Sequence, residues 1–562
     1  MATAPAFASP HRFFHPGPAP RAANGTEALS KRAYLAALAA LVAAALVLQL
    51  GLFGAGFHRL SFDDSARSLM AHDLSWANAF EPYIWPPFYK WFVGLALKLW
   101  GDVFLVPRLL VGLAGLLVIL ALVRLSDLLF GGDRRVNLLT AALAVAFPHR
   151  LVFSVAPLSD IYAYLFLIAA AGCVLAWLRR GSVAQLLLGC ACVLGAETVR
   201  FEAGSFAAAL SVLVLHRWLV RRELGFGAAA AAGALLFAFP ALWVLNSFLW
   251  YGSLDNLGLT GRHYAANFGT DRLRALYLSP LGRNLALDLV WNPLMLAGLA
   301  ALARAAARDA AVRAWALAFG VPLVLSTAVM VATLSITMGV PWRTTGVWAL
   351  LLLPFEAFAV VALAVRLGRG RARGLALAAL LAVALLPPAA RSAVYVREGM
   401  LDHQTGGPRT ERAAGLHAVR ELDRSGGGGK ALVDSAGNLE FLDVLALSGA
   451  PRRFVLSHGT DPQVVANAFP LGGPLPPDRF GLARGGSDEA LAAEGVRLLL
   501  VRAPRFIAAL DAAGRWERAE TFGGWVLYRP RAAGSGRVTP GPAPAIPRPG
   551  PAGTPGAATG AN

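Results

Sequence analysis

Two adjacent carboxylates, Asp63 and Asp64, follow the first long apolar stretch of the chain, in the segment RLSFDDSARSLMAHDLSWANAFEPYIWPPFYKW (59–91). A carboxylate in a partly apolar cleft can act as a general base that takes the proton of a hydroxyl group. The pair is therefore a candidate catalytic site. The plain alternative is that both residues are loop acids excluded from a lipid bilayer.

Other ionisable residues stand beside apolar stretches further along the chain and supply a second kind of chemistry. They are Asp160, Glu197, Arg200, Glu202, Arg262, His263 and Arg343. Arginine keeps its charge and can bind two phosphate oxygens through parallel N–H groups. Arginines beside a carboxylate base therefore suit transfer of a group from a phosphate-linked donor to a hydroxyl acceptor.

Several of these residues also have a purely structural interpretation. Glu197 and Glu202 can pair with Arg200 and stabilise a hairpin, and His263 can be an ordinary loop histidine. Arg343 can anchor its helix at the level of the lipid headgroups. The residue types alone leave these alternatives open.

The composition predicts a polytopic α-helical membrane protein. Of 562 residues, 57% are hydrophobic and only 15% are charged, whereas soluble domains carry about 25% charged residues. Apolar stretches of about 20 residues, the length of a membrane-spanning helix, recur along the chain. We expect about eleven spans, near 34–56, 104–126, 136–152, 158–178, 183–199, 203–219, 227–249, 285–303, 314–338, 345–365 and 374–391. The apolar segment 87–100 is short for a span and is predicted to be an interfacial or re-entrant helix.

The distribution of positive charge predicts the orientation. A net charge of +18 would indicate a nucleic-acid partner in a soluble protein, but most cations here lie in short loops between apolar stretches. Compact basic loops alternate with longer, less basic ones, and the basic set includes 31–32, 124–135 and 217–222. The positive-inside rule places that set in the cytoplasm. We therefore expect membrane lipid and no nucleic acid as a partner, in a bacterial cytoplasmic membrane.

This orientation divides the chain into four parts and places the candidate residues at the outer face. Residues 1–32 are predicted to be a disordered cytoplasmic tail, and 33–391 a transmembrane catalytic domain. Residues 392–531 are predicted to form a small extracytoplasmic α/β domain, because KALVDSA, RRFVLS, VRLLLVRA and GWVLYRP have the pattern of strands. The stretch APRFIAALDAAGRWERAETF is predicted to be one helix, and the Pro/Gly/Ala-rich residues 532–562 a disordered tail.

Nucleotide-binding and disulfide chemistry find little support in the sequence. It contains neither a Walker A loop nor a Gly-rich dinucleotide fingerprint. SGGGGK (425–430) lacks the spacing of a phosphate-binding loop and is interpreted as a flexible turn. Cys173, Cys190 and Cys192 lie in apolar stretches and are interpreted as buried small side chains.

With these residues in view, the chain resembles the polytopic GT-C glycosyltransferases of the protein mannosyltransferase/aminoarabinose transferase superfamily. The matching segments are, in order, Asp63-Asp64, Pro86-Pro87-Phe88-Tyr89, Trp100-Gly101, Arg108-Leu109, Asp160, VRFEAG (199–204), NSFLWYGSL (246–254) and PWRTTGVWALLLLP (341–354). The resemblance covers roughly 34–366. Asp64 stands where the family has Glu, which shortens its reach, and Arg343-Thr344 replaces an Arg-Tyr pair.

The resemblance implies transfer of a sugar from a polyprenyl-phosphate donor to a hydroxyl acceptor, with inversion at the anomeric carbon. The acceptor would be a protein, a glycolipid or an envelope glycan. The resemblance implies that Asp63 is the catalytic base with Asp64 as its helper, and that Asp160 is a second acidic group in the site. The implied substrate-binding residues are Tyr89, Arg200, Glu202, Arg262, His263 and Arg343.

Cofactor use and two other functions stay open. The family branch generally needs no metal, so no cofactor is expected, although two adjacent aspartates can bind a divalent cation. One alternative function is a non-catalytic scaffold subunit of an envelope complex. Another is a lipid or solute transporter, which predicts internal repeats and charges near the membrane midplane.

Overall fold

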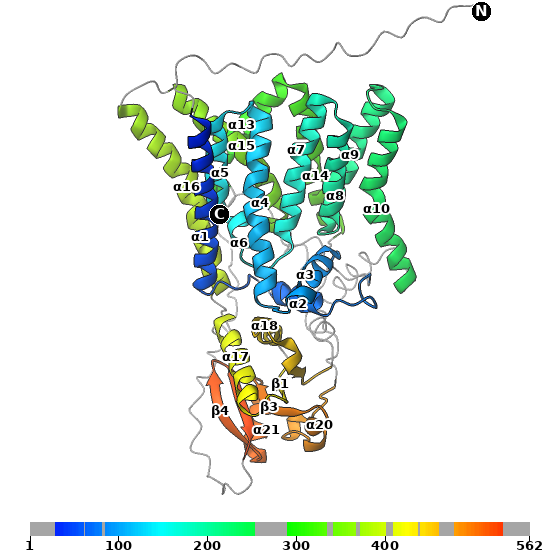
Figure 1. Cartoon of the computed structure of the whole chain (residues 1–562), viewed down its shortest axis with the longest axis vertical. Coiled ribbons are helices and arrows are strands. Elements are labelled where there is room, and N and C mark those ends of the chain that lie inside the picture. Colours follow the sequence, from blue (N-terminus) through cyan, green and yellow to red (C-terminus); the bar gives the residue numbers. More distant parts are fainter. Residues whose placement is uncertain are drawn as a thin grey trace, which may run out of the picture.

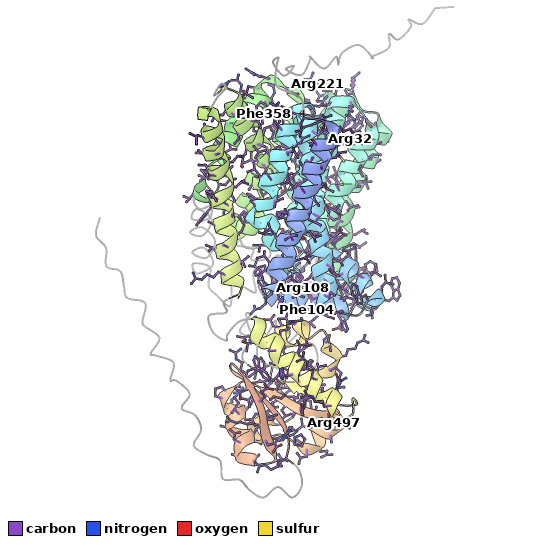
Figure 2. The ribbon with its side chains drawn as sticks, turned by 60° about the vertical axis from the view of Figure 1, so that its left-hand side comes forward. Arg32, Phe104, Arg108, Arg221, Phe358 and Arg497 are labelled. Carbon is purple, nitrogen blue, oxygen red and sulfur yellow. The ribbon has the colours of Figure 1, made fainter. Side chains whose placement is uncertain are left out.

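The computed structural model describes residues 29–60, 62–80, 85–252, 289–333, 341–366, 371–400, 408–436, 439–459 and 477–531. A bundle of long helices stands on a smaller lobe that contains a β-sheet (Figure 1). Figure 2 places Arg32 and Arg221 at the end of the bundle away from the lobe, and Phe104 and Arg108 at the end that faces it. Two arginines from predicted cytoplasmic loops thus share one end of the bundle.

The bundle is assembled around α7, which packs against α4, α8, α14 and α15. Its described helices are α1 (Lys31–Gly54), α4 (Leu105–Phe130), α5 (Arg134–Ala146), α6 (Pro148–Phe153), α7 (Asp160–Arg180), α8 (Val183–Glu197), α9 (Gly204–Leu215), α10 (Phe226–Tyr251), α13 (Met295–Arg308), α14 (Ala310–Thr333), α15 (Pro341–Arg366) and α16 (Arg371–Met400). A helix that is apolar on all sides is stable only inside a protein or in lipid. Buried α7 represents the first case and α1, most of whose apolar side chains are exposed, represents the second.

Among the described residues, seven helical segments are long and apolar enough to cross a membrane, which makes the chain a multi-pass membrane protein. They are Lys31–Gly54, Leu105–Phe130, Asp160–Arg180, Phe201–Val220, Phe226–Trp250, Gly346–Arg366 and Gly374–Val394. Val183–Glu197 and Ala310–Pro322 are shorter apolar helices. Part of the expected span 285–303 lies outside the described residues.

The expected single span over 136–152 is wrong, because the chain breaks between α5 and α6. Phe147 has an extended backbone with φ −71° and ψ 125°, and Pro148 then begins α6. A proline disfavours helical geometry at the residue before it but fits well at the first position of a new helix. The break therefore has a local cause.

Two short helices, α2 (Phe62–His72) and α3 (Phe88–Leu99), lie at the lobe-facing end of the bundle (Figure 1). They pack closely on each other because Gly94 of α3 has no side chain. A Cβ at this position would lie 2.7 Å from the carbonyl oxygen of Ala71 and 2.7 Å from Leu74 Cδ2. The opposite face of α3 exposes Phe92, Leu95 and Leu99, as an interfacial helix does.

The lobe has a five-stranded sheet in the order β2-β1-β3-β5-β4. The strands are β1 (Lys430–Val433), β2 (Phe454–Leu456), β3 (Val496–Val501), β4 (Trp516–Phe522) and β5 (Trp525–Pro530). Strands β1, β2 and β3 are parallel, whereas β5 pairs antiparallel with β3 and β4. The lobe's main helices are α17 (Pro408–Arg424), α18 (Glu440–Leu447), α20 (Asp488–Ala493) and α21 (Pro504–Ala513).

Four of these strands lie within the segments that the sequence predicted to be strands, but the single helix expected just before the last of them is wrong. Helix α21 ends at Ala513, and Gly514 follows in the left-handed conformation with φ +70°. Glycine adopts this conformation at low cost, so it commonly ends a helix. The chain then continues as strand β4.

Lobe and bundle share one boundary, where α18 packs against α2. All eight residues of α18 are buried, and apolar side chains of α18 and α2 belong to one continuous core. Helix α16 runs to Met400, so its last turns extend beyond the domain boundary expected at residue 391.

The close approach of α2 and α3 yields a prediction about stability. We expect Gly94→Ala to lower the free energy of unfolding by about 1 to 3 kcal/mol, because a backbone oxygen must move to admit the methyl group. Gly51→Ala in α1 is the matched control, since a Cβ there meets nothing within 4 Å and alanine favours a helix. Equal stability of the two variants in detergent-based unfolding experiments would contradict this packing.

Candidate active site

The two first-loop carboxylates lie in the first turn of α2, where the positive end of the helix dipole stabilises negative charge. Asp64 is fully buried, and its Oδ2 accepts a hydrogen bond from the Leu60 backbone N–H at 2.7 Å. Asp63 is only half-buried. The two carboxylates therefore have different surroundings. Asp64 binds the segment that leads into α2, and Asp63 is partly exposed to solvent.

Tyr89 of α3 is connected to this pair through Ser68. Ser68 Oγ donates to the Asp64 carbonyl oxygen at 2.7 Å and lies 3.2 Å from the Tyr89 hydroxyl. Burial raises the pKa of the Tyr89 phenol, against smaller opposing effects of Ser68 and of the charge on Arg108. The phenol therefore stays protonated and is a hydrogen-bond donor at neutral pH.

Arg108 of α4 fixes the segment that leads into α2. Its Nε and Nη2 donate to the His58 carbonyl oxygen at 3.0 and 2.6 Å, and its Nη1 donates to the Phe104 carbonyl oxygen at 2.5 Å. The guanidinium also lies over the Phe104 ring, 4.4 Å from its centroid. The Arg-Leu element of the family resemblance thus has a clear structural task in this chain.

Arg67 connects α2 to the start of α7. Its Nη1 donates to Ser159 Oγ at 2.5 Å, and its guanidinium lies 4.6 Å from the centroid of the Trp85 ring. Ser159 directly precedes Asp160. Because Asp63 and Arg67 are four residues apart on a helix, they share one face of α2. This face is the one that adjoins the beginning of α7.

A second cluster of acidic residues lies at the beginning of α7, where one arginine binds two carboxylates. Arg200 Nη1 lies 2.6 Å from Asp160 Oδ1, and its Nη2 lies 2.5 Å from Glu202 Oε1. The side chains of Asp160, Arg200 and Glu202 are 0%, 11% and 7% exposed. Charge-assisted hydrogen bonds of this kind are strong when water is excluded. One guanidinium therefore orients two carboxylates.

Glu197 does not join this cluster, so Arg200 pairs with Glu202 and not with both neighbouring glutamates. Both carboxylate oxygens of Glu197 are buried, with no hydrogen-bond partner among the described residues. Sequence proximity alone did not distinguish these partners. The decisive partner, Asp160, lies 40 positions away along the chain.

Arg343 lies in the first turn of α15, and its side chain is not among those described. One turn further on, a Cβ at Gly346 would lie 2.4 Å from the Tyr164 hydroxyl. Tyr164 is one turn beyond Asp160 on α7. The beginning of α15 therefore lies beside the beginning of α7. Arg262 and His263 lie outside the described residues.

Six of the predicted site residues are thus found at one end of the bundle: Asp63, Asp64, Tyr89, Asp160, Arg200 and Glu202. The sequence analysis missed Arg67 and Ser159, which connect them. The available signal was the spacing of Arg67 from Asp63, four residues on within a helix. Among the described residues, no three metal-ligating His, Cys, Asp or Glu side chains gather at one point.

Comparison with known proteins places this arrangement in a fold. No protein-family model matches the chain, and no curated protein sequence matches it. ArnT from Cupriavidus metallidurans, in the apo state, superposes with a TM-score of 0.55 over 88% of this chain and 98% of ArnT, at 16% identity. ArnT is a membrane glycosyltransferase of the GT-C superfamily. This chain has the GT-C fold.

Two further matches come from the same superfamily. The oligosaccharyltransferase of Archaeoglobus fulgidus in the apo form covers 84% of this chain and 70% of its own, with a TM-score of 0.47 and 11% identity. The archaeal oligosaccharyltransferase AglB, in complex with an inhibitory peptide and a dolichol-phosphate, covers 89% and 74%, with a TM-score of 0.44 and 11% identity.

The shared guanidinium of the second acidic group gives a stability prediction. We expect Arg200→Gln to lower the free energy of unfolding by about 3 to 5 kcal/mol, because two buried carboxylates lose the positive charge that they share. Arg124→Gln is the control, since it breaks a pair with Asp127 in which Arg124 is 57% exposed and which contributes less than about 1 kcal/mol. Denaturant titration of both variants in detergent measures the difference, and similar losses would refute the buried cluster.

Proposed function

We propose that the protein transfers a sugar from a polyprenyl-phosphate donor to a hydroxyl acceptor at the outer face of a bacterial cytoplasmic membrane. The main support is that two sets of acidic residues lie close together at one end of a bundle with the GT-C fold. Arg67 connects the helix of Asp63 and Asp64 to Ser159, beside the Asp160–Arg200–Glu202 cluster. A carboxylate base and a set of arginines at the membrane surface suit this reaction.

In the proposed reaction Asp63 is the general base. It takes the proton of the acceptor hydroxyl, and the acceptor oxygen forms a bond with the anomeric carbon of the sugar. The bond from that carbon to the phosphate oxygen breaks, and its electron pair leaves with the polyprenyl phosphate. A single displacement of this kind inverts the anomeric centre. Asp63 suits the role better than Asp64, because Asp63 is half-buried, whereas Asp64 is fully buried and accepts the Leu60 N–H.

The departing phosphate needs positive charge, which we assign to Arg200, Arg262 and Arg343. Arg200 is held by Asp160 and Glu202, so its orientation is set before a donor arrives. Such preorganisation is more effective than a mobile charge because the group need not be ordered during the reaction. We assign Tyr89, Glu202 and His263 to contacts with the sugar or the acceptor.

The proposal uses no metal cofactor. A divalent cation between Asp63 and Asp64 is the chemical alternative, since carboxylate oxygens are its preferred ligands. The engagement of Asp64 with the Leu60 N–H favours the metal-free form.

The base role yields a direct functional prediction. With the protein in lipid and a panel of polyprenyl-phosphate sugars, release of free polyprenyl phosphate should depend on one donor. Asp63→Asn should slow that release about 10² to 10⁴-fold, because asparagine keeps the size but cannot accept the proton. Asp73→Asn is the control, since Asp73 is an exposed acid directly after α2.

Equal turnover by wild type and Asp63→Asn would contradict the base assignment. Absence of both turnover and donor binding for every donor in the panel would favour the scaffold or the transporter instead.

The proposed orientation can be tested without a substrate. It places the end of the bundle with Arg32 and Arg221 in the cytoplasm and the lobe outside (Figure 2). In a variant without the three native cysteines, a membrane-impermeant maleimide should label Glu489→Cys in intact cells and spare Arg221→Cys. Both positions are exposed, so labelling after lysis is the control. The reverse pattern would overturn the orientation.

A further inference from the structure

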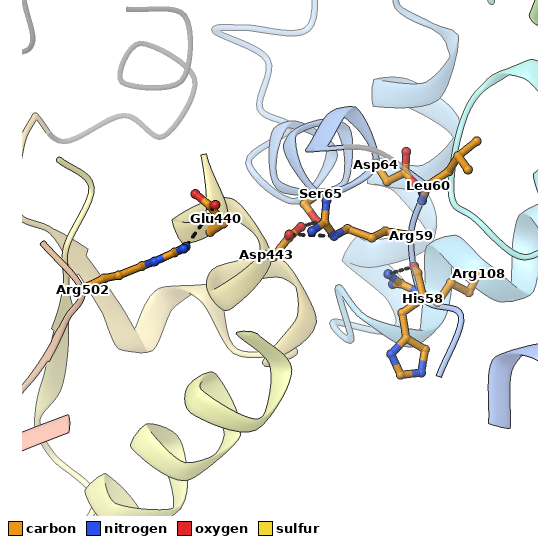
Figure 3. A network of polar contacts seen from close by, with 9 residues as sticks. All are labelled: His58, Arg59, Leu60, Asp64, Ser65, Arg108, Glu440, Asp443 and Arg502. Atoms are coloured by element: carbon orange, nitrogen blue, oxygen red, sulfur yellow. Dashed lines mark hydrogen bonds and ion pairs between the residues drawn. The ribbon is translucent and has the colours of Figure 1, made fainter. Parts of the chain in front are cut away.

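Asp443 of α18, in the lobe, is bound to both sides of the candidate catalytic turn. Its Oδ1 accepts a hydrogen bond from Ser65 Oγ at 2.5 Å, and its Oδ2 lies 2.8 Å from Arg59 Nε (Figure 3). The carboxylate is fully buried, and the Arg59 side chain is 8% exposed. Arg59 and Ser65 flank Asp63 and Asp64 in the sequence, so a single side chain of the lobe holds the segment that carries both.

The bundle holds the same segment from its other side. Arg108 binds the carbonyl oxygen of His58, directly before Arg59. The Leu60 N–H, directly after Arg59, is bound within the segment by Asp64 (Figure 3). The entry into α2 is therefore held between α4 and α18, and the position of Asp63 depends on both.

Helix α18 is itself fastened to the sheet. Glu440, in its first turn, lies 3.0 Å from Arg502 Nη1, which directly follows β3 (Figure 3). The backbone N–H of Arg502 donates to Asp434 Oδ2 at 3.1 Å, and Asp434 directly follows β1. A continuous series of polar contacts thus leads from the ends of two central strands, through α18, to the candidate catalytic turn.

We propose that Asp443 is a positioning residue for the reaction and that the lobe completes the active site by docking α18 on α2. The proposal rests on the proposed function for its catalytic part. When α18 is docked, Asp443 fixes the first turn of α2 and the base faces the acceptor. When α18 is undocked, the contacts of Asp443 with Arg59 and Ser65 are broken, the turn loosens and transfer stops.

The physical reason is the sensitivity of proton transfer to position. A displacement of about 1 Å can slow a reaction on the order of 10²-fold. Removing one charge of a buried ion pair destabilises the charge that remains buried. Loss of the Asp443 charge should therefore affect the rate of the chemical step more than donor binding, because Arg200 and its carboxylates lie outside this contact.

The test compares Asp443→Asn with Asp423→Asn in the full-length protein in lipid nanodiscs. Asparagine keeps the oxygen that accepts from Ser65 but removes the charge that faces Arg59. Asp423 is the matched control, because it lies in the same lobe and pairs with Arg453 while 58% exposed. The first readout is hydrogen exchange of the α2 backbone, which needs no substrate. The second is kcat and KM for donor-dependent release of polyprenyl phosphate.

For Asp443→Asn we expect exchange in the first turns of α2 to accelerate about tenfold or more. We expect kcat to fall about 10- to 100-fold, with KM for the donor within about twofold of wild type. Asp423→Asn should leave all three unchanged. Combining Asp443→Asn with Arg59→Gln should restore part of kcat, because a buried arginine charge then no longer faces a neutral asparagine.

Unchanged α2 exchange in Asp443→Asn would overturn the docking contact. A fall in kcat that only follows global unfolding, with no recovery in the double variant, would overturn the positioning role. If Asp443→Asn does not fold, Ser65→Ala replaces it, and an α2 exchange rate equal to wild type would then refute the proposal. If the wild type turns over no donor, the catalytic part fails with the proposed function, while exchange alone decides the docking contact.

Discussion

Charges that are shielded from water at the lobe-facing end of the bundle must be paired, and this constraint organises the rest of the structure. Asp64, Asp160 and Asp443 have no exposed surface. An ionised carboxylate in such a place is stable only with hydrogen-bond donors or opposite charge around it. Asp64 accepts the Leu60 N–H just before its own helix. Asp160 pairs with Arg200, and Asp443 contacts Arg59 and Ser65.

The same pairings decide how the elements meet. Arg200 follows α8 and reaches the first turn of α7, while Arg67 of α2 reaches the residue before that turn. Both α2 and α7 begin with acidic residues at this end, where helix dipoles favour negative charge. The surrounding apolar core brings the helices together, and the ionic contacts select which turn faces which. The ion pairs that stabilise the packing therefore also bring acidic and basic side chains together at this end of the bundle.

The candidate site lies between an exposed apolar surface and a polar one. A lipid-linked substrate has an apolar and a polar part of the same kind. The exposed apolar face of α3, with Leu95 and Leu99, adjoins the buried face that carries Tyr89. A prenyl chain and its phosphate have the same division between an apolar and a charged part. The lobe lies beyond this end of the bundle and contacts α2 through α18 (Figure 1). Under the proposed function, the donor would approach this place from the membrane and the acceptor from the side of the lobe.

Properties that depend on local pattern could be predicted from the sequence. Apolar stretches identified most of the long helices, short apolar segments identified β1, β2, β3 and β5, and the pair Asp63-Asp64 marked the first loop. These succeed because hydrophobicity and turn preference act over neighbouring residues. The same reasoning missed β4, because the helix was extended past Gly514, although glycine commonly ends a helix.

Which charged residues pair with one another depends on the packing of the helices and could not be predicted from the sequence. Arg200 has Glu197 and Glu202 as near neighbours in the sequence but binds Glu202 and the distant Asp160. Asp443 is not among the residues singled out from the sequence, yet it binds Ser65 from 378 positions away. Such contacts depend on how helices rotate and pack against one another, which residue spacing along the chain does not encode. The local pattern therefore predicted the carboxylates and arginines of the site, and the packing of α2, α7 and α18 determined their connections.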